Sequence, residues 1–199
     1  MEIKNTDLIF KEIDHTYVLH SKNIILPSVT QIMAPLSSYI YKDIPTNIVS
    51  RKANVGSDVH HATELYDLYK VEDIKEEEKG YLEAYKKFVA DYKPQMIFIE
   101  LQHYHTKYYY AGTIDRLALI DNKCVLFDIK TTEPIHPELV AVQTSAYERI
   151  FKNENIEVDE RATLLLRPDG SYEFIRDLPD RWDIFESLLK IHYFKPKIK

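Results

Sequence analysis

The chain has 199 residues, of which 45% are hydrophobic, and it carries a formal net charge of −6. This length and apolar content are sufficient for one globular domain with a packed core. The single cysteine, Cys124, excludes an internal disulfide and any site built from four cysteines, such as an iron–sulfur cluster. The four glycines lie far apart, which excludes the glycine-rich loops that bind nucleotide phosphates.

The first residues lack the apolar centre of a signal peptide, and no uncharged run has the roughly 20 mainly apolar residues of a membrane helix. We therefore expect a soluble, cytoplasmic protein. The negative charge does not exclude a nucleic-acid partner. Five acids and two lysines in residues 71–79 contribute −3, which leaves only −3 for the rest of the chain.

The first 55 residues predict a β-hairpin followed by a helical extension. Residues 7–26 alternate apolar and polar side chains in two short runs, which is typical of a pair of strands. Ser28 and Gln31 match a capping box, so a short helix should begin there and end before Pro35. We expect both elements to belong to one domain with residues 56–199.

Two longer helices are predicted next. Residues 56–70 have Ser57 as a candidate N-cap and an acid in the first turn. Residues 78–92 carry apolar side chains at helical spacing and end before Pro94, and we expect this apolar stripe to face the core.

From residue 96 the hydrophobic period changes to two, which predicts three consecutive antiparallel strands over 96–105, 108–120 and 123–130. A helix should follow from Pro137 to about Lys152, then two strands on either side of a turn at 168–170, and a final amphipathic helix. We therefore predict an α/β fold with a central mixed sheet flanked by helices, in the order αβββαβ.

An acid and a base stand two positions apart in the apolar run CVLFDIK. Because side chains alternate along a strand, Asp128 and Lys130 should share a face, and Asp115 on the preceding strand should lie near them. Burial of an acid and a lysine in a strand costs several kcal/mol unless they are paired or bind a ligand. This cost indicates a functional site rather than a surface ion pair.

Two helices place polar side chains where they could reach the same site. Residues four apart share a helix face, so His60 should project with Glu64, and Gln143 with Tyr147. An acid-rich cluster with one imidazole suits Mg²⁺ or Mn²⁺. Such an ion would polarise a phosphodiester, while Lys130 could stabilise charge on the phosphate or orient water.

The motifs occur in a fixed order, which is G-S-x-x-H-x-x-x-E from Gly56, G-T-I-D from Gly112, D-I-K-T from Asp128 and Q-x-x-x-Y from Gln143. This order resembles the RecB-like branch of the PD-(D/E)xK nuclease superfamily, over residues 56–150. The opening strands and the segment PSVTQIM are similar to phage-type members and to the mitochondrial genome-maintenance exonuclease. The resemblance implies a restriction-endonuclease-like core.

The resemblance also implies roles for individual residues. The metal would be held by His60, Asp115, Asp128 and the main-chain carbonyl of Ile129, with Lys130, Asp115 and Asp128 as the catalytic residues. Gln143 and Tyr147 would contact or orient DNA. Glu64 and Glu100 are candidates for supporting positions next to the ligands. Some members hold an iron–sulfur cluster through four cysteines, which this chain lacks.

The predicted function is therefore a Mg²⁺- or Mn²⁺-dependent DNA exonuclease. Its substrate would be single-stranded DNA or DNA with free ends, in repair, recombination or replication, with a recombination or replication protein as a further partner. A bacterial or phage-infected cytoplasm is the expected setting. A structure-specific endonuclease and a catalytically idle DNA-binding protein on the same fold are the alternatives.

Other residues allow further interpretations. His103 and His105 could form a zinc site with His60, although no spacing supports one. Residues 108–110 are three tyrosines, which could stack on unpaired bases. His61 should face away from the site. The remaining candidates are basic residues that could bind phosphates, namely Arg51, Lys52, Arg149, Lys152 and the tail at 195–199.

Overall fold

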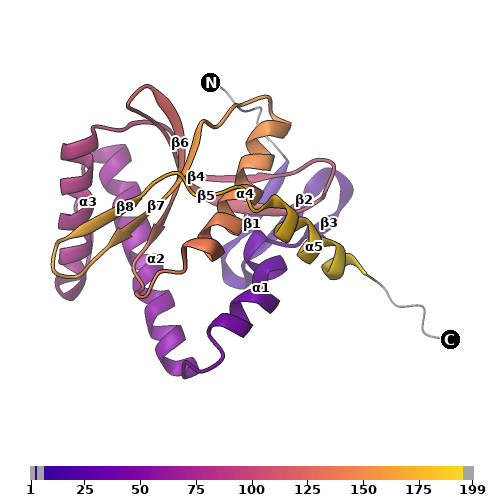
Figure 1. Ribbon diagram of the computed structural model, residues 1–199, viewed down its shortest axis with the longest axis horizontal. Coiled ribbons are helices and arrows are strands. Elements are labelled where there is room, and N and C mark those ends of the chain that lie inside the picture. The colour runs from indigo at the N-terminus through magenta and orange to yellow at the C-terminus, as the bar shows by residue number, and fades with distance from the viewer. Residues whose placement is uncertain (1–2, 4–6, 195–199) are drawn as a thin grey trace.

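The computed structural model describes residue 3 and residues 7–194 (Figure 1). It confirms the α/β class with a central mixed sheet flanked by helices. The strands are β1 (Leu8–Lys11), β2 (Thr16–Leu19), β3 (Ile24–Leu26), β4 (Gln95–Tyr104), β5 (Ala111–Ile120), β6 (Lys123–Lys130), β7 (Glu160–Leu166) and β8 (Tyr172–Ile175). The α-helices are α1 (Val29–Ile40), α2 (Thr46–Tyr69), α3 (Lys79–Tyr92), α4 (Pro137–Asn153) and α5 (Trp182–Tyr193). None of the described helices is long and apolar enough to cross a membrane.

The central sheet has five strands in the order β4-β5-β6-β7-β8. Its neighbours are antiparallel except β6 and β7, which run parallel and are joined by α4. The β5–β6 turn is tight because Asp121 and Asn122 both adopt the left-handed conformation that this kind of turn requires. The predicted order αβββαβ is thus present from α3 to β7.

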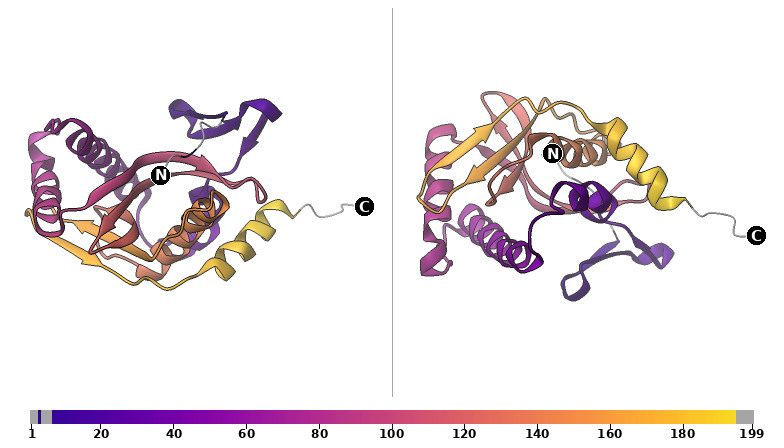
Figure 2. Two further views of the ribbon diagram at one scale, coloured as in Figure 1. Left: turned by 90° about the horizontal axis from the view of Figure 1, so that it is seen from above. Right: turned by 60° about the horizontal axis from the view of Figure 1, so that its bottom comes forward.

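Helices cover both faces of this sheet. Figure 2 shows α2 and α3 on one side, with α4 and α5 on the other. The alternation along β6 divides its side chains as predicted. Leu126 belongs to the core beneath α1, α4 and α5, whereas Val125, Phe127 and Ile129 belong to the core beneath α3. The face that carries Leu126 also carries Asp128 and Lys130.

The N-terminal unit is a sheet of three antiparallel strands rather than the predicted hairpin. After β2 the chain turns through Asn23, which is left-handed, and pairs again as β3. Tyr17, Leu19 and Leu26 form a small core with Ala111, so this sheet packs on the open end of the β4–β5 hairpin. Three short strands with one apolar face need this support to be stable.

Two predicted helix boundaries are wrong. The first helix, α1, continues through Pro35 to Ile40. Pro35 is exposed, so the carbonyl that loses its partner can bind water, while Ile32 and Met33 pack in the core. The second, α2, begins at Thr46 instead of Ser57, whose hydroxyl donates back to the Ala53 carbonyl. A good capping residue does not start a helix where the preceding residues are already helical.

Candidate metal centre

The candidate centre lies where strands β5 and β6 stop pairing. Their register ends at Arg116 opposite Phe127, one residue before the two acids. Beyond that point the Asp115 carboxylate takes over the role of a strand partner, since its Oδ2 accepts a hydrogen bond of 2.7 Å from the backbone N–H of Ile129. The separation of the strands therefore leaves the side chains of Asp115 and Asp128 inside the fold, where both are buried.

Glu100 reaches the same place from β4 through an unusual backbone conformation. Its neighbours Ile99 and Leu101 pair with β5, but Glu100 itself has a φ of 45° in the middle of the strand. A non-glycine residue held in the left-handed region costs on the order of 1–3 kcal/mol and is a recognised mark of functional sites. Its Oε1 accepts a hydrogen bond of 2.8 Å from Arg116 Nη1. The local strain thus directs this carboxylate inward.

His60 completes the cluster from the middle of α2. Its Nδ1 lies 3.2 Å from Glu100 Oε1 and 3.7 Å from Asp115 Oδ2, and its Nε2 donates to the Ile129 carbonyl at 3.1 Å. One ligand atom from each of His60, Glu100 and Asp115 lies within 4.8 Å of the others. Burial alone would lower the pKa of His60, but the two carboxylates outweigh burial and raise that pKa to about 9.

Asp128 and Lys130 form an ion pair beside this cluster. Lys130 Nζ lies 2.7 Å from Asp128 Oδ2, although this oxygen is buried and accepts no hydrogen bond from the part of the chain that the structure describes. Burial raises the pKa of Asp128, and it also raises that of Asp115. The carboxylates of Glu100, Asp115 and Asp128 therefore converge with one ammonium group between them and the next helix.

Gln143 and Tyr147 connect Lys130 to α4. Gln143 Oε1 accepts from Lys130 Nζ at 3.2 Å, and Gln143 Nε2 donates to the Tyr147 hydroxyl at 3.4 Å. Tyr147 lies directly over β5 because position 112 is glycine. A Cβ there would come within 2.6 Å of Tyr147 Cε1. The glycine of the GTID motif is thus required for the close packing of α4 at the site.

Arg116, which the sequence analysis did not single out, anchors the cluster from behind. It is fully buried, and its guanidinium donates to Asp67 Oδ2 at 2.8 Å and Thr63 Oγ1 at 3.1 Å, both on α2. The same group holds Glu100 and also donates to the Asp115 carbonyl at 2.7 Å. A basic residue directly after an acid in an apolar strand was the only signal in the sequence.

Tyr17 is a second residue that the sequence analysis missed. Its hydroxyl lies 2.8 Å from Thr113 Oγ1, although 96 positions separate the two residues. Burial raises the pKa of this phenol, and the charges of Glu100 and Asp115 raise it further. The N-terminal sheet therefore contributes a hydroxyl to the margin of the site.

The structure also separates some predicted residues from the cluster. Glu64 faces His61, with the His61 Nδ1 atom 3.9 Å from Glu64 Oε2, and does not meet His60. The zinc alternative is wrong for the described residues, where His103 and His105 do not group with His60. His103 Nε2 lies 3.3 Å from Glu154, and His105 Nδ1 accepts from the backbone of Lys107.

The basic candidates make contacts away from the cluster. Lys52 donates to the Glu133 carbonyl at 3.1 Å, and Arg149 pairs with Asp180 at 2.7 Å. Arg51 and Lys152 are exposed. The tail at 195–199 lies outside the described residues.

The residues present fit a hard divalent cation. Carboxylates of Glu100, Asp115 and Asp128, the imidazole of His60 and the Ile129 carbonyl offer the oxygen-rich donor set that Mg²⁺ and Mn²⁺ prefer. The unbonded Oδ2 of Asp128 and the excess of carboxylates over cations are the features that an added positive charge would satisfy. The protonated imidazole holds the position between Glu100 and Asp115.

The fold and the site together define an α/β protein with a candidate cation centre at the middle of its main sheet. Searches against protein-family models and against curated proteins found no match. Among solved structures, the chain is similar to an alkaline exonuclease, LHK-Exo, from Laribacter hongkongensis, at 12% identity and a TM-score of 0.35, over 68% of this chain and 76% of that one. A similarity at this level carries no argument about activity, so the function is argued from the site.

Proposed function

We propose that the protein is a Mg²⁺- or Mn²⁺-dependent deoxyribonuclease that acts at DNA ends. The observation that carries this proposal is the convergence of His60, Glu100 and Asp115 within 4.8 Å, next to the Asp128–Lys130 pair. The ordered motifs resemble those of RecB-like nucleases and support the same activity. On that resemblance we also assign a role in DNA repair, recombination or replication.

Each residue has a part that follows from its contacts. A bound cation would supply Lewis-acid polarisation of the phosphate and a more acidic water. Lys130, held by Asp128 and Gln143, places an ammonium where it can stabilise negative charge on the phosphate and orient the attacking water. Tyr147, held by Gln143, lies beside the cluster and can position the strand.

Cleavage of DNA by the purified protein tests this proposal. End-labelled single- and double-stranded DNA should be degraded with Mn²⁺, and degradation should stop in chelator. Lys130→Ala should lower the rate by about 10²- to 10⁴-fold. Lys123→Ala is the matched control, because Lys123 lies on the same strand and also pairs with a buried acid, but at the opposite end. Full activity in Lys130→Ala would refute the mechanism.

The end requirement is tested separately with circular single-stranded DNA. An exonuclease leaves this substrate intact, whereas a structure-specific endonuclease on the same site cuts it. Absence of any cleavage with Mg²⁺ or Mn²⁺, together with retained DNA binding, would instead identify a catalytically idle DNA-binding protein.

A further inference from the structure

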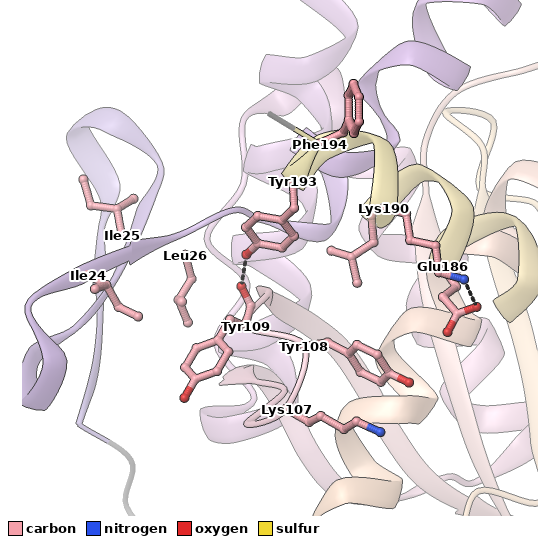
Figure 3. Close-up of a pocket in the computed structure, with 11 residues that line it drawn as sticks. Ile24, Ile25, Leu26, Lys107, Tyr108, Tyr109, Glu186, Lys190, Tyr193 and Phe194 are labelled. Carbon is pink, nitrogen blue, oxygen red and sulfur yellow. Dashed lines mark hydrogen bonds and ion pairs between the residues drawn. The ribbon is translucent and has the colours of Figure 1, made fainter. Parts of the chain in front are cut away.

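An apolar groove lies at the tip of the β4–β5 hairpin, away from the candidate metal centre. It has a volume of about 680 Å³ and lies between β3, the turn at 107–109 and the end of α5. Figure 3 shows Leu26, Tyr109 and Tyr193 converging in it, with Lys107 and Lys190 at its side. We call it the hairpin groove.

Lysines accompany the aromatic rings of the hairpin groove. Lys22 Nζ lies 4.6 Å from the ring centroid of Tyr109, and Lys107 Nζ lies 5.3 Å from that of Tyr108. Glu186 is the one acid among the described lining residues, and its charge is paired with Lys190 at 2.7 Å. In a chain of net charge −6, this region therefore combines exposed aromatic surface with unbalanced positive charge.

The backbone of the turn is strained at Tyr109. This residue has a φ of 54°, a conformation that asparagine or glycine adopts at much lower cost. Its carbonyl accepts a hydrogen bond of 2.6 Å from the Tyr193 hydroxyl, which ties the turn to α5. An aromatic residue kept at a strained turn tip indicates that the ring itself is used.

We propose that the hairpin groove binds single-stranded DNA at a distance from the reacting phosphate, with bases against its rings and phosphates near Lys22 and Lys107. Aromatic rings with lysines are the usual means of holding unpaired strands without sequence preference. Six residues of the hairpin separate Tyr109 from Asp115, which is about 20 Å of extended chain. The groove would thus hold the strand several nucleotides from the cut. This role rests on the proposed nuclease function.

Binding measurements without metal separate the groove from catalysis. Fluorescence anisotropy in chelator compares a labelled 5-mer and 20-mer of deoxythymidylate. Tyr193→Ala should weaken binding of the 20-mer by about 5- to 100-fold, with little change for the 5-mer. Lys107→Ala should lower the salt dependence of 20-mer binding by about 0.7 per phosphate contact. Tyr193→Phe, which keeps the ring, should bind nearly as well as the wild type.

Lys70→Ala is the matched control, since Lys70 also lies over a tyrosine ring, that of Tyr66, but outside the groove. Because Lys107 is exposed, its variant should fold normally. Unchanged 20-mer binding in both Tyr193→Ala and Lys107→Ala would overturn the proposal and leave the groove as a surface for an apolar peptide. Loss of 20-mer binding in those variants of a protein that cleaves no DNA would support the groove while refuting the nuclease.

Discussion

Two groups of buried acids lie on the same central sheet, and they are built in opposite ways. At the end of β7, the buried Glu160 accepts from Arg176 at 2.5 and 2.9 Å and from Lys123 at 3.2 Å. These partners lower the pKa of Glu160. At the candidate metal centre, burial instead raises the pKa of Asp115 and Asp128, and one Asp128 oxygen accepts no hydrogen bond from the described residues.

The difference distinguishes an ionic network that stabilises the fold from one that costs stability. A buried carboxylate is stabilising only when donors and cations compensate for its lost hydration. Glu160 has two cationic partners, whereas Glu100, Asp115 and Asp128 exceed the cations near them. A bound divalent ion would restore the balance, which is why we regard the metal centre as the functional one.

The largest expected difference between the two networks is in their response to metal. Mn²⁺ at 100 times its Kd should stabilise the wild-type protein by about 2.7 kcal/mol, because the ion binds only the folded state. Asp115→Asn should lose this increment, and Glu160→Gln should keep it. Urea unfolding with and without Mn²⁺ measures both. The comparison fails if Asp115→Asn is stabilised as strongly as the wild type.

A smaller effect is expected from the arginine of each network. Arg116→Lys keeps the charge but loses the planar fork that holds Glu100, so Mn²⁺ affinity should fall by about 10- to 100-fold. Arg176→Lys makes the same replacement beside Glu160 and should leave Mn²⁺ affinity unchanged. Isothermal titration calorimetry provides the measurement. Equal affinities in the two variants would show that Arg116 only supports the fold.

The smallest effect concerns pH and Glu160. Glu160→Gln should lower the free energy of unfolding by about 1 kcal/mol at neutral pH, because glutamine still accepts one hydrogen bond. Since the pKa of Glu160 is lowered in the folded state, the advantage of the wild type is present above about pH 4.3. It is lost as the pH falls through the lower folded value. Unfolding curves from pH 7 to 3 should converge, and a constant gap would contradict this.

Some of the site follows directly from local patterns in the sequence. The period of two in residues 123–130 places Asp128 and Lys130 on one face, and the short turn at Asp121 and Asn122 brings Asp115 alongside. Glu64 shows the limit of such patterns, because residues three and four apart on a helix are nearly equivalent, and Glu64 turned to His61.

Glu100 and Arg116 could not be placed from the sequence. The direction of Glu100 depends on a left-handed backbone in mid-strand, which no propensity predicts. That conformation is held by Arg116, which in turn is held by Asp67 and Thr63 on another element. The contacts join residues 16 to 53 positions apart, so they exist only after the helix has packed on the sheet.

The sequence by itself therefore determined the α/β class, the element order and the face of β6 that carries the chemistry, because these depend on periodicities along a single segment. Tertiary structure alone decided the third N-terminal strand, the start of α2, the inward turn of Glu100, the arrival of Tyr17 at the site and the hairpin groove. Each of these depends on packing between segments that are distant in the chain, where local preference is outweighed by burial and by the pairing of charges.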